Sequence, residues 1–180
     1  MQISAGPVAV GESFTPETST TWTFGDVQQR GTENFTTGIN SYIVLQNPQN
    51  TVAQVVTRVY DAELGVSFRT VRFVQQNGRA GVYLGTGPSA SPDILFDAEN
   101  TTTEEGATLE ALIRAEYQRR GVSEAIIQQL LNADRRYSVS VSSDVPIVAA
   151  KSTYNPLERQ ATGTVGNEGV GTTTGVLTEG

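Results

Sequence analysis

The sequence predicts an all-β protein: an antiparallel β-sandwich with a two-helix insertion and extended N- and C-terminal arms. Short runs rich in β-branched and aromatic residues recur over residues 19–155, with turn residues at the spacing typical of a sandwich. Residues 107–134 change to helical periodicity. Residues 1–18 and 156–180 are punctuated by Gly, Pro and Thr and lack a core-forming pattern, which predicts an arm at each end.

The first strand is predicted directly after the N-terminal arm. In residues 20–24, Trp22 and Phe24 alternate with Thr, as expected for a half-buried strand. Residues 26–38 are polar and contain two glycines, so we expect a loop there.

The strongest strand signals lie in three β-branched-rich runs, residues 41–46, 52–60 and 66–74. Residues 61–65 predict a hairpin loop between the last two. Asn77-Gly78 is a strong hairpin signal that leads into residues 79–84. We therefore expect a meander of neighbouring antiparallel strands.

Two short amphipathic helices are predicted next. The stripe over residues 107–120 consists of Leu109, Leu112, Ile113 and Tyr117. Gly121 suits the position after the helix, and Ser123 suits the N-cap of a helix over residues 124–134. The apolar face of that helix consists of Ile126, Ile127, Leu130 and Leu131. We expect the pair to cover an open end or face of the sheets.

Two more strands are predicted before the tail. Residues 137–142 alternate cleanly, with Tyr137, Val139 and Val141 on the core face. A turn at residues 144–146 then leads into a strand over residues 147–154.

Three segments carry a resemblance to a known family: Thr20–Gly25 (TTWTFG), Tyr42–Pro48 (YIVLQNP) and Pro146–Tyr154 (PIVAAKSTY). They resemble the tandem Ig-like β-sandwich modules of bacterial secreted and surface proteins, whose function is uncharacterised. The resemblance covers most of residues 18–180 outside the helical insertion, and Lys151 departs from the Glu-Arg of the common pattern. It implies an Ig-like sandwich in an extracellular or cell-surface protein.

The tail contains a degraded copy of the first strand, because Thr173–Gly180 can be aligned with Thr20–Val27. A terminal strand without a local partner can add to the sheet edge of another subunit, and head-to-tail addition of this kind gives fibres. The residues predicted to exchange between subunits are Thr174, Val176 and Leu177 in the tail, or Val8 and Val10 in the N-terminal arm.

Composition excludes several kinds of chemistry. The chain has no Cys and no His, which removes disulfides, thiolate nucleophiles, Ser-His-Asp triads and the usual zinc ligands. A net charge of −7 argues against nucleic acid and anionic membrane surfaces as partners. No segment has the pattern of a signal peptide or a membrane span. We therefore expect a protein that is not an enzyme and needs no cofactor.

Other candidate sites are few. Asp93, Asp97 and Glu99 lie in one acidic loop and could supply oxygen ligands to Ca²⁺, but the spacing typical of a calcium-binding loop is absent, which favours a solvated acidic loop. Lys151, the sole lysine, could serve a Ser-Lys dyad, an isopeptide bond or an intersubunit pair, or extend outward from a strand. The paired arginines 119–120 and 135–136 would complement the helix dipoles. A sugar-stacking platform could come from Trp22, Tyr42, Tyr60, Tyr83, Tyr137 and Tyr154.

The function predicted is that of a non-catalytic extracellular structural protein. It would be a filament or surface-array subunit whose partner is a second copy of itself, joined by strand exchange. One alternative is a carbohydrate-binding or adhesin module with surface glycans as partners. Another is a virion capsid or decoration protein.

Overall fold

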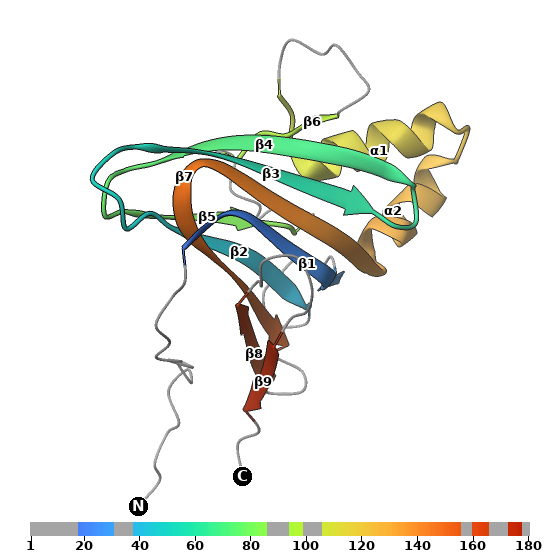
Figure 1. The fold of residues 1–180 in the computed structure, drawn as a ribbon. Coiled ribbons are helices and arrows are strands. Elements are labelled where there is room, and N and C mark those ends of the chain that lie inside the picture. Colours follow the sequence, from blue (N-terminus) through green and yellow to red (C-terminus); the bar gives the residue numbers. More distant parts are fainter. Residues whose placement is uncertain are drawn as a thin grey trace, which may run out of the picture.

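The computed structural model describes residues 18–30, 38–85, 94–98, 106–155, 160–165 and 173–177, and only the backbone beyond residue 153. Figure 1 shows a curled sheet with two helices at one end. The elements in chain order are β1 (Ser19–Arg30), β2 (Asn40–Gln46), β3 (Ala53–Asp61), β4 (Val66–Val74), β5 (Arg79–Tyr83), β6 (Asp97–Ala98), α1 (Leu109–Arg119), α2 (Glu124–Asn132), β7 (Asp134–Asn155), β8 (Gln160–Val165) and β9 (Thr173–Leu177).

Strand β7 organises the sheet, and its strand pairs are antiparallel. Residues 134–143 of β7 lie between β1 and β3, and the order continues through β4 to β6; we call this the first half-sheet. Residues 148–155 of β7 lie between β2 and β8, with β5 and β9 at the two edges; we call this the second half-sheet. The prediction of an antiparallel all-β fold with two helices is confirmed.

The prediction of two separate strands around a turn at residues 144–146 is wrong. Residues 134–155 form one strand, and residues 144–146 are the segment in which β7 leaves the partners of one half-sheet for those of the other. Pro146 has no backbone N–H to donate. It lies between the two sets of strand partners of β7, where no ladder hydrogen bond needs that donor.

The loop predicted from residue 26 is also wrong over its first part, because residues 26–30 continue β1. Val27 and Gln29 are buried there and lie opposite Tyr137 and Arg135 of β7. A register shift between Phe24 and Val27 accommodates the Gly25-Asp26 dipeptide as a bulge. Pairing with a long neighbouring strand thus overrides the polar composition of the segment.

The predicted meander is half right. Strands β3 and β4 form the expected hairpin, with Ala53 opposite Val74 and Asp61 opposite Val66. Asn77 adopts a positive φ of 53°, and the Gly78 N–H donates to the Gln75 carbonyl at 2.9 Å, so a turn does form. However, β5 then pairs with β2 instead of β4. A local turn signal does not select the partner strand.

The helical hairpin forms as predicted, with small differences. The Thr108 side chain caps α1, and Gly121 adopts a positive φ of 77° between the helices. Ser123 occupies the N-cap of α2 without a side-chain capping bond, and Ile126 is exposed although it was expected on the buried face. The helices cover one end of the curled sheet (Figure 1).

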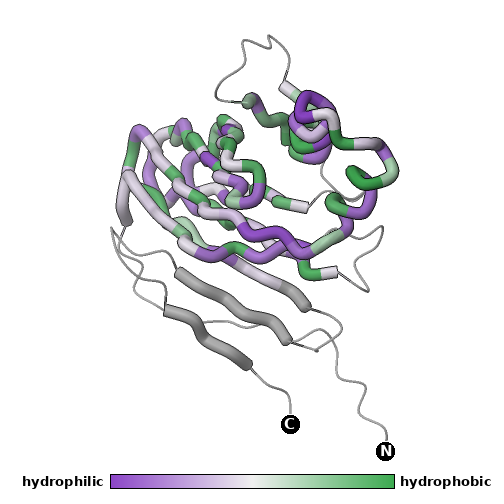
Figure 2. The backbone as a smooth tube through the Cα atoms, turned by 90° about the vertical axis from the view of Figure 1, so that its right-hand side faces the viewer, coloured by the Kyte–Doolittle hydropathy of each residue, from purple (hydrophilic) through white to green (hydrophobic). Residues whose placement is uncertain are grey.

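The core is one cluster to which both half-sheets and both helices contribute. Figure 2 shows how hydrophobic and hydrophilic residues alternate along the strands. The side chains that fill the interior are mostly apolar, but among the described residues an arginine, Arg135, is the largest fully buried side chain. Charged residues are almost never fully buried unless they are paired. We therefore expect Arg135 to have an acidic partner and further hydrogen bonds in the core.

Candidate functional site

The second half-sheet ends at a strand close to the C-terminus. Strand β8 pairs with residues 150–155 of β7, and β9 then pairs with β8. In that register Thr174 lies opposite Thr164, Val176 opposite Thr162 and Leu177 opposite Ala161. Within the described ranges β8 is the partner strand of β9, so β9 is the edge of this half-sheet.

The expectation that the tail strand lacks a local partner is therefore wrong. Thr174, Val176 and Leu177 pair with a strand of their own chain, and exchange with a second copy stays a prediction. The alternative donors, Val8 and Val10, lie outside the described residues. Sequence reasoning missed β8 because the segment lacks alternating apolar residues, although its β-branched residues were a usable signal.

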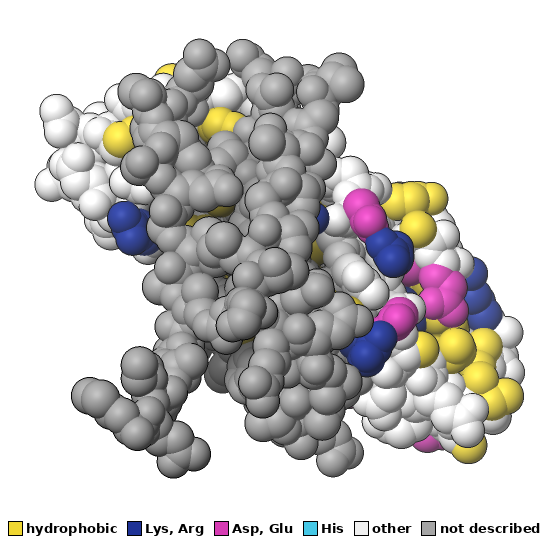
Figure 3. All heavy atoms as spheres, turned by 90° about the horizontal axis from the view of Figure 1, so that it is seen from below, with side chains coloured by type: hydrophobic (Ala, Val, Ile, Leu, Met, Phe, Trp, Pro, Cys, Tyr) yellow, Lys and Arg dark blue, Asp and Glu magenta, His cyan; other side chains and the backbone are white. Residues whose placement is uncertain are grey.

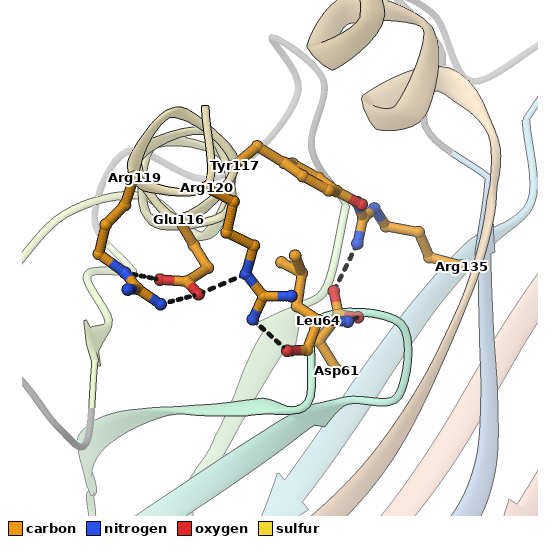
Figure 4. A network of polar contacts seen from close by, with 7 residues as sticks. All are labelled: Asp61, Leu64, Glu116, Tyr117, Arg119, Arg120 and Arg135. Carbon is orange, nitrogen blue, oxygen red and sulfur yellow. Dashed lines mark hydrogen bonds and ion pairs between the residues drawn. The ribbon is translucent and has the colours of Figure 1, made fainter. Parts of the chain in front are cut away.

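A buried polar network links the first half-sheet to α1 (Figure 4). The Arg135 Nη1 atom lies 2.5 Å from Asp61 Oδ2, and each of the two side chains is 1% exposed. The Arg135 Nη2 atom donates to the Tyr117 hydroxyl at 2.6 Å, and that hydroxyl donates to Glu63 Oε1 at 2.9 Å. The Tyr117 ring lies 5.3 Å from the guanidinium carbon. The cation is thus paired, hydrogen-bonded and stacked.

The same network holds the β3–β4 loop. Asp61 Oδ1 accepts from the backbone N–H groups of Glu63 and Leu64, at 2.9 and 3.0 Å. Arg120, after the end of α1, donates to the Leu64 carbonyl at 2.5 Å and to Glu116 Oε1 at 2.8 Å. A β-hairpin loop, a helix and the start of β7 are therefore fastened to one another by polar contacts.

The expectation that both arginine pairs complement helix dipoles is wrong for Arg135 and Arg136, because both lie in β7 beyond the end of α2. The Arg135 side chain lies in the core, while Arg136 points outward and pairs with Asp26. The signal was available in the sequence, because Arg135 shares the inward parity of Tyr137, Val139 and Val141. The prediction followed the charge of the residue, whereas its place in the alternation indicates burial. On the face seen in Figure 3, basic and acidic side chains lie side by side.

Burial changes the pKa of several groups in and near the network. Burial alone would lower the pKa of Arg135, but the nearby Asp61 carboxylate and further acidic groups raise it overall. Burial raises the pKa of Tyr117, and the hydrogen bond to Glu63 raises it further. Burial also raises the pKa of Tyr137 strongly. All three pKa values move upward from ordinary values that already leave the arginine charged and the phenols neutral at physiological pH.

Lys151 fastens β7 to β1. Its Nζ donates to the Asp26 main-chain oxygen at 2.7 Å, while the Asp26 carboxylate pairs with Arg136. Burial lowers the pKa of this half-buried amine. The contact is with a carbonyl oxygen, and it accounts for the lysine as a structural tie between two strands.

The predicted Ca²⁺ ligands cannot be compared as a set. Asp97 lies half-buried on β6, opposite Arg69 of β4, while Asp93 and Glu99 fall outside the described residues. Among the residues that are described, no three acidic side chains gather closely enough to hold a metal ion. The calcium site stays a prediction.

Of the aromatic residues proposed as a sugar platform, Tyr154 has a side chain outside the described part of the structure, and the others divide between core and surface. Trp22, Tyr83 and Tyr137 are buried, and Tyr42 stacks on Tyr83 with centroids 4.8 Å apart. Tyr60 is exposed on the opposite side of the first half-sheet from the core. The described aromatics thus do not gather on one exposed surface.

Comparisons with known proteins leave the family open. A scan against protein-family models found no match, and a search of curated proteins found none. Among solved structures, the chain is similar to the crystal structure of Thermotoga maritima 1070, at 11% sequence identity and a TM-score of 0.43. The alignment covers 83% of this chain and 94% of that one. At this TM-score the likeness supports neither a fold assignment nor a function. No helix in the described ranges is long and apolar enough to cross a bilayer.

Proposed function

We propose that this chain is a non-catalytic structural protein of the cell exterior. In this proposal it is an Ig-like β-sandwich whose copies join head to tail, by strand exchange, into a filament or surface array. The expectation of an Ig-like module comes from the sequence resemblance, and the two half-sheets around one core are compatible with it.

The observation that carries the proposal is the position of β9. It lies at a sheet edge near the end of the chain and pairs with β8 through five residue pairs. If the β9 segment of a second copy took this place, the same backbone hydrogen bonds would form, so exchange costs little. When every copy donates a strand to the next, the contact does not close on itself and a filament grows.

Two further features support a structural role. The chain lacks His and Cys, on which many catalytic sites depend. The Arg135–Asp61 ion pair at the centre of the polar network is sealed from solvent, so it is placed to stabilise the fold instead of meeting a substrate.

Engineered cysteines test the exchange directly, because the wild-type chain has none. Thr164 and Thr174 lie opposite each other in the β8–β9 register, within reach of a disulfide. The Thr164→Cys and Thr174→Cys variants are mixed at assembly concentration and oxidised. Exchange predicts a disulfide-linked heterodimer, which denaturing electrophoresis detects.

Matched controls make the result specific. Each single variant, oxidised alone, gives the yield of disulfide-linked dimer that random collisions produce. The double variant, with both cysteines in one chain, gives the yield of the disulfide within a chain. Efficient closure within the double variant, with no more heterodimer in the mixture than in the single-variant controls, rejects exchange of β9. Donation by the N-terminal arm is then tested by deleting residues 1–17.

Electron microscopy of the purified chain separates the alternatives. Filaments support the proposal, and closed shells favour a virion protein. Monomers that bind glycans favour a carbohydrate-binding module.

A further inference from the structure

In the part of the chain that the structure describes, the curled sheet ends at four strands: β1, β5, β6 and β9. An edge strand offers unpaired backbone N–H and C=O groups to any further strand. Proteins therefore protect such edges with short strands, bulges, charged side chains or proline. The four edges of this sheet differ in that protection, and the difference indicates which of them is suited to pair with another chain.

Three of the edges are protected. Strand β6 has only two residues. Strand β1 has two register shifts along its pairing with β7, one between Ser19 and Thr21 and one between Phe24 and Val27. Strand β5 begins with an exposed charged residue, Arg79. Each of these features disfavours regular pairing with a further strand.

Strand β9 lacks these features. Its five residues, Thr173–Leu177 (TTGVL), contain no charged residue and no proline, and neither do the residues of β8. The pairing of β9 with β8 is regular through all five residues. Strand β9 lies at the end of the molecule opposite the helical hairpin, so the helices do not cover its edge (Figure 1). Among the described edges, β9 is therefore the unprotected one.

We propose that the edge of β9 pairs with the β9 edge of a second copy, antiparallel and across a two-fold axis. Because the other three described edges are protected, the edge that suits β9 is that of another β9. Antiparallel pairing centred on Gly175 overlaps all five residues, with Thr173 opposite Leu177 and Thr174 opposite Val176. Both copies contribute the same surface, so the contact closes as a dimer.

This contact does not depend on attraction between charges. Two copies with a net charge of −7 repel each other, but β8 and β9 add no charge at the contact itself. Backbone hydrogen bonds between the strands supply the attraction. Raising the salt from about 0.1 to about 1 M shortens the Debye length from about 10 to about 3 Å, so association of the wild type should strengthen. Association that weakens with salt contradicts the inference.

The inference rests on the proposed function, because it assumes that the chain assembles with itself, and it adds a second contact. Exchange places the β9 strand of one copy on the β8 strand of the next, and β9 still ends the half-sheet in that arrangement. Its outer edge is then free to join a second row of subunits. Strand exchange would lengthen a row, whereas edge pairing would double it.

A single cysteine in the full-length chain tests the register. In the proposed dimer Gly175→Cys lies opposite its own copy, at the about 4.5–5.5 Å between directly opposed residues, which suits a disulfide. Thr174→Cys is the matched control, since its two copies lie diagonally, about 7–8 Å apart, at or beyond the limit of a disulfide. We expect oxidation to give several-fold more linked dimer from Gly175→Cys than from Thr174→Cys.

A second pair of variants keeps the test valid if Gly175→Cys folds poorly. Thr174 and Val176 lie opposite each other in the proposed dimer, so a mixture of Thr174→Cys and Val176→Cys should give more linked dimer than either variant alone. The inference is overturned if neither the mixture nor Gly175→Cys exceeds its control.

Sedimentation velocity over a range of protein concentrations tests the contact without cross-linking. Val176→Lys places on β9 the kind of charge that protects natural edges. We expect it to need an about tenfold or higher concentration than the wild type for the same degree of association. Thr23→Lys adds the same charge at an exposed position of β1 and should associate like the wild type. An equal loss in both variants, or a wild type that stays monomeric, overturns the inference.

The cross-links also separate this inference from the proposed function. Exchange places Thr174 of one copy opposite Thr164 of another, whereas edge pairing places Gly175 opposite Gly175. If Gly175→Cys forms the linked dimer while the mixture of Thr164→Cys and Thr174→Cys does not, strand exchange fails and edge pairing stands. The reverse result supports exchange and rejects edge pairing.

Discussion

Arg135 and Asp61 form an ion pair that is sealed inside the protein, with a distance of 2.5 Å between Nη1 and Oδ2. Two charges in the interior lose their hydration, and the loss is compensated only when their geometry and further hydrogen bonds are good. Here Tyr117 accepts from Arg135 and the backbone of the β3–β4 loop donates to Asp61, although the buried Nε of Arg135 has no hydrogen-bond partner among the described residues. The pair therefore joins β7, the hairpin loop and α1 into one unit.

Asp61→Asn is expected to lower the free energy of unfolding by about 3–5 kcal/mol, because it leaves the Arg135 cation buried without its counter-ion. Asparagine keeps an oxygen that can accept from the N–H groups of Glu63 and Leu64, so the change isolates the charge. Urea denaturation measures the difference.

The exposed pair of Arg136 and Asp26 provides the control. Both side chains are more than half exposed, so Arg136→Ala should cost less than about 1 kcal/mol. A loss of less than about 1 kcal/mol in Asp61→Asn as well would contradict the assigned role of the buried pair.

Tyr137→Phe is expected to leave stability unchanged or to raise it by about 1–3 kcal/mol. In the part of the chain that the structure describes, the buried hydroxyl has no hydrogen-bond partner, so its removal relieves a desolvation cost. Thermal unfolding at about pH 7 measures the change. A clear loss of stability would mean that the hydroxyl makes a bond, and Tyr60→Phe at the surface is the control.

The same variant is expected to resist alkali better. Burial raises the pKa of Tyr137 above the ordinary value of 10.0, so above about pH 10 the unfolded chain releases the proton while the folded chain keeps it. The stabilising effect of this shift is complete below about pH 10 and declines as the pH rises through the folded-state pKa. Stability curves from about pH 9 to about pH 12 should therefore fall less steeply in Tyr137→Phe, and parallel curves would refute the expectation.

Glu116→Gln is expected to destabilise the protein in a pH-dependent way. The hydrogen bond from Arg119, with a further one from Arg120, lowers the pKa of Glu116 from 4.5 to about 2. The stabilisation is therefore present above about pH 4.5 and is lost as the pH falls toward about 2. The difference between wild type and variant should shrink over that range in urea titrations, and a constant difference would show that the charge does not matter.

Gly121→Ala is expected to cost about 1–2 kcal/mol, because a residue with a side chain is strained at φ 77°. A Cβ atom at this position would meet no other atom within 4 Å, so the cost is conformational. Gly25→Ala is the matched control, since its Cβ also has open space and its φ is not in the left-handed region. Equal stabilities of the two variants would contradict this interpretation.

Local patterns in the sequence predicted the elements whose periodicity is strong. The β4 strand has the predicted bounds, residues 66–74, and the β3–β4 hairpin and both helices form near the expected positions. In these segments β-branched alternation or a helical apolar stripe agrees with the burial that the fold requires. Where the pattern is weak, the prediction failed: β8 was missed, and the second part of β1 was predicted as a loop.

By itself, the sequence determined that this is a β-rich chain with a helical hairpin and without cysteine or histidine. Only the tertiary structure decided that β5 joins β2, that β7 serves two half-sheets and that Arg135 lies inside. The physical reason is that turns and periodicity act over a few residues. Strand partnership and charge burial depend on residues far apart in the chain, as Asp61 and Arg135 are. Contacts between such residues contribute to stability only after the chain has folded and brought them together.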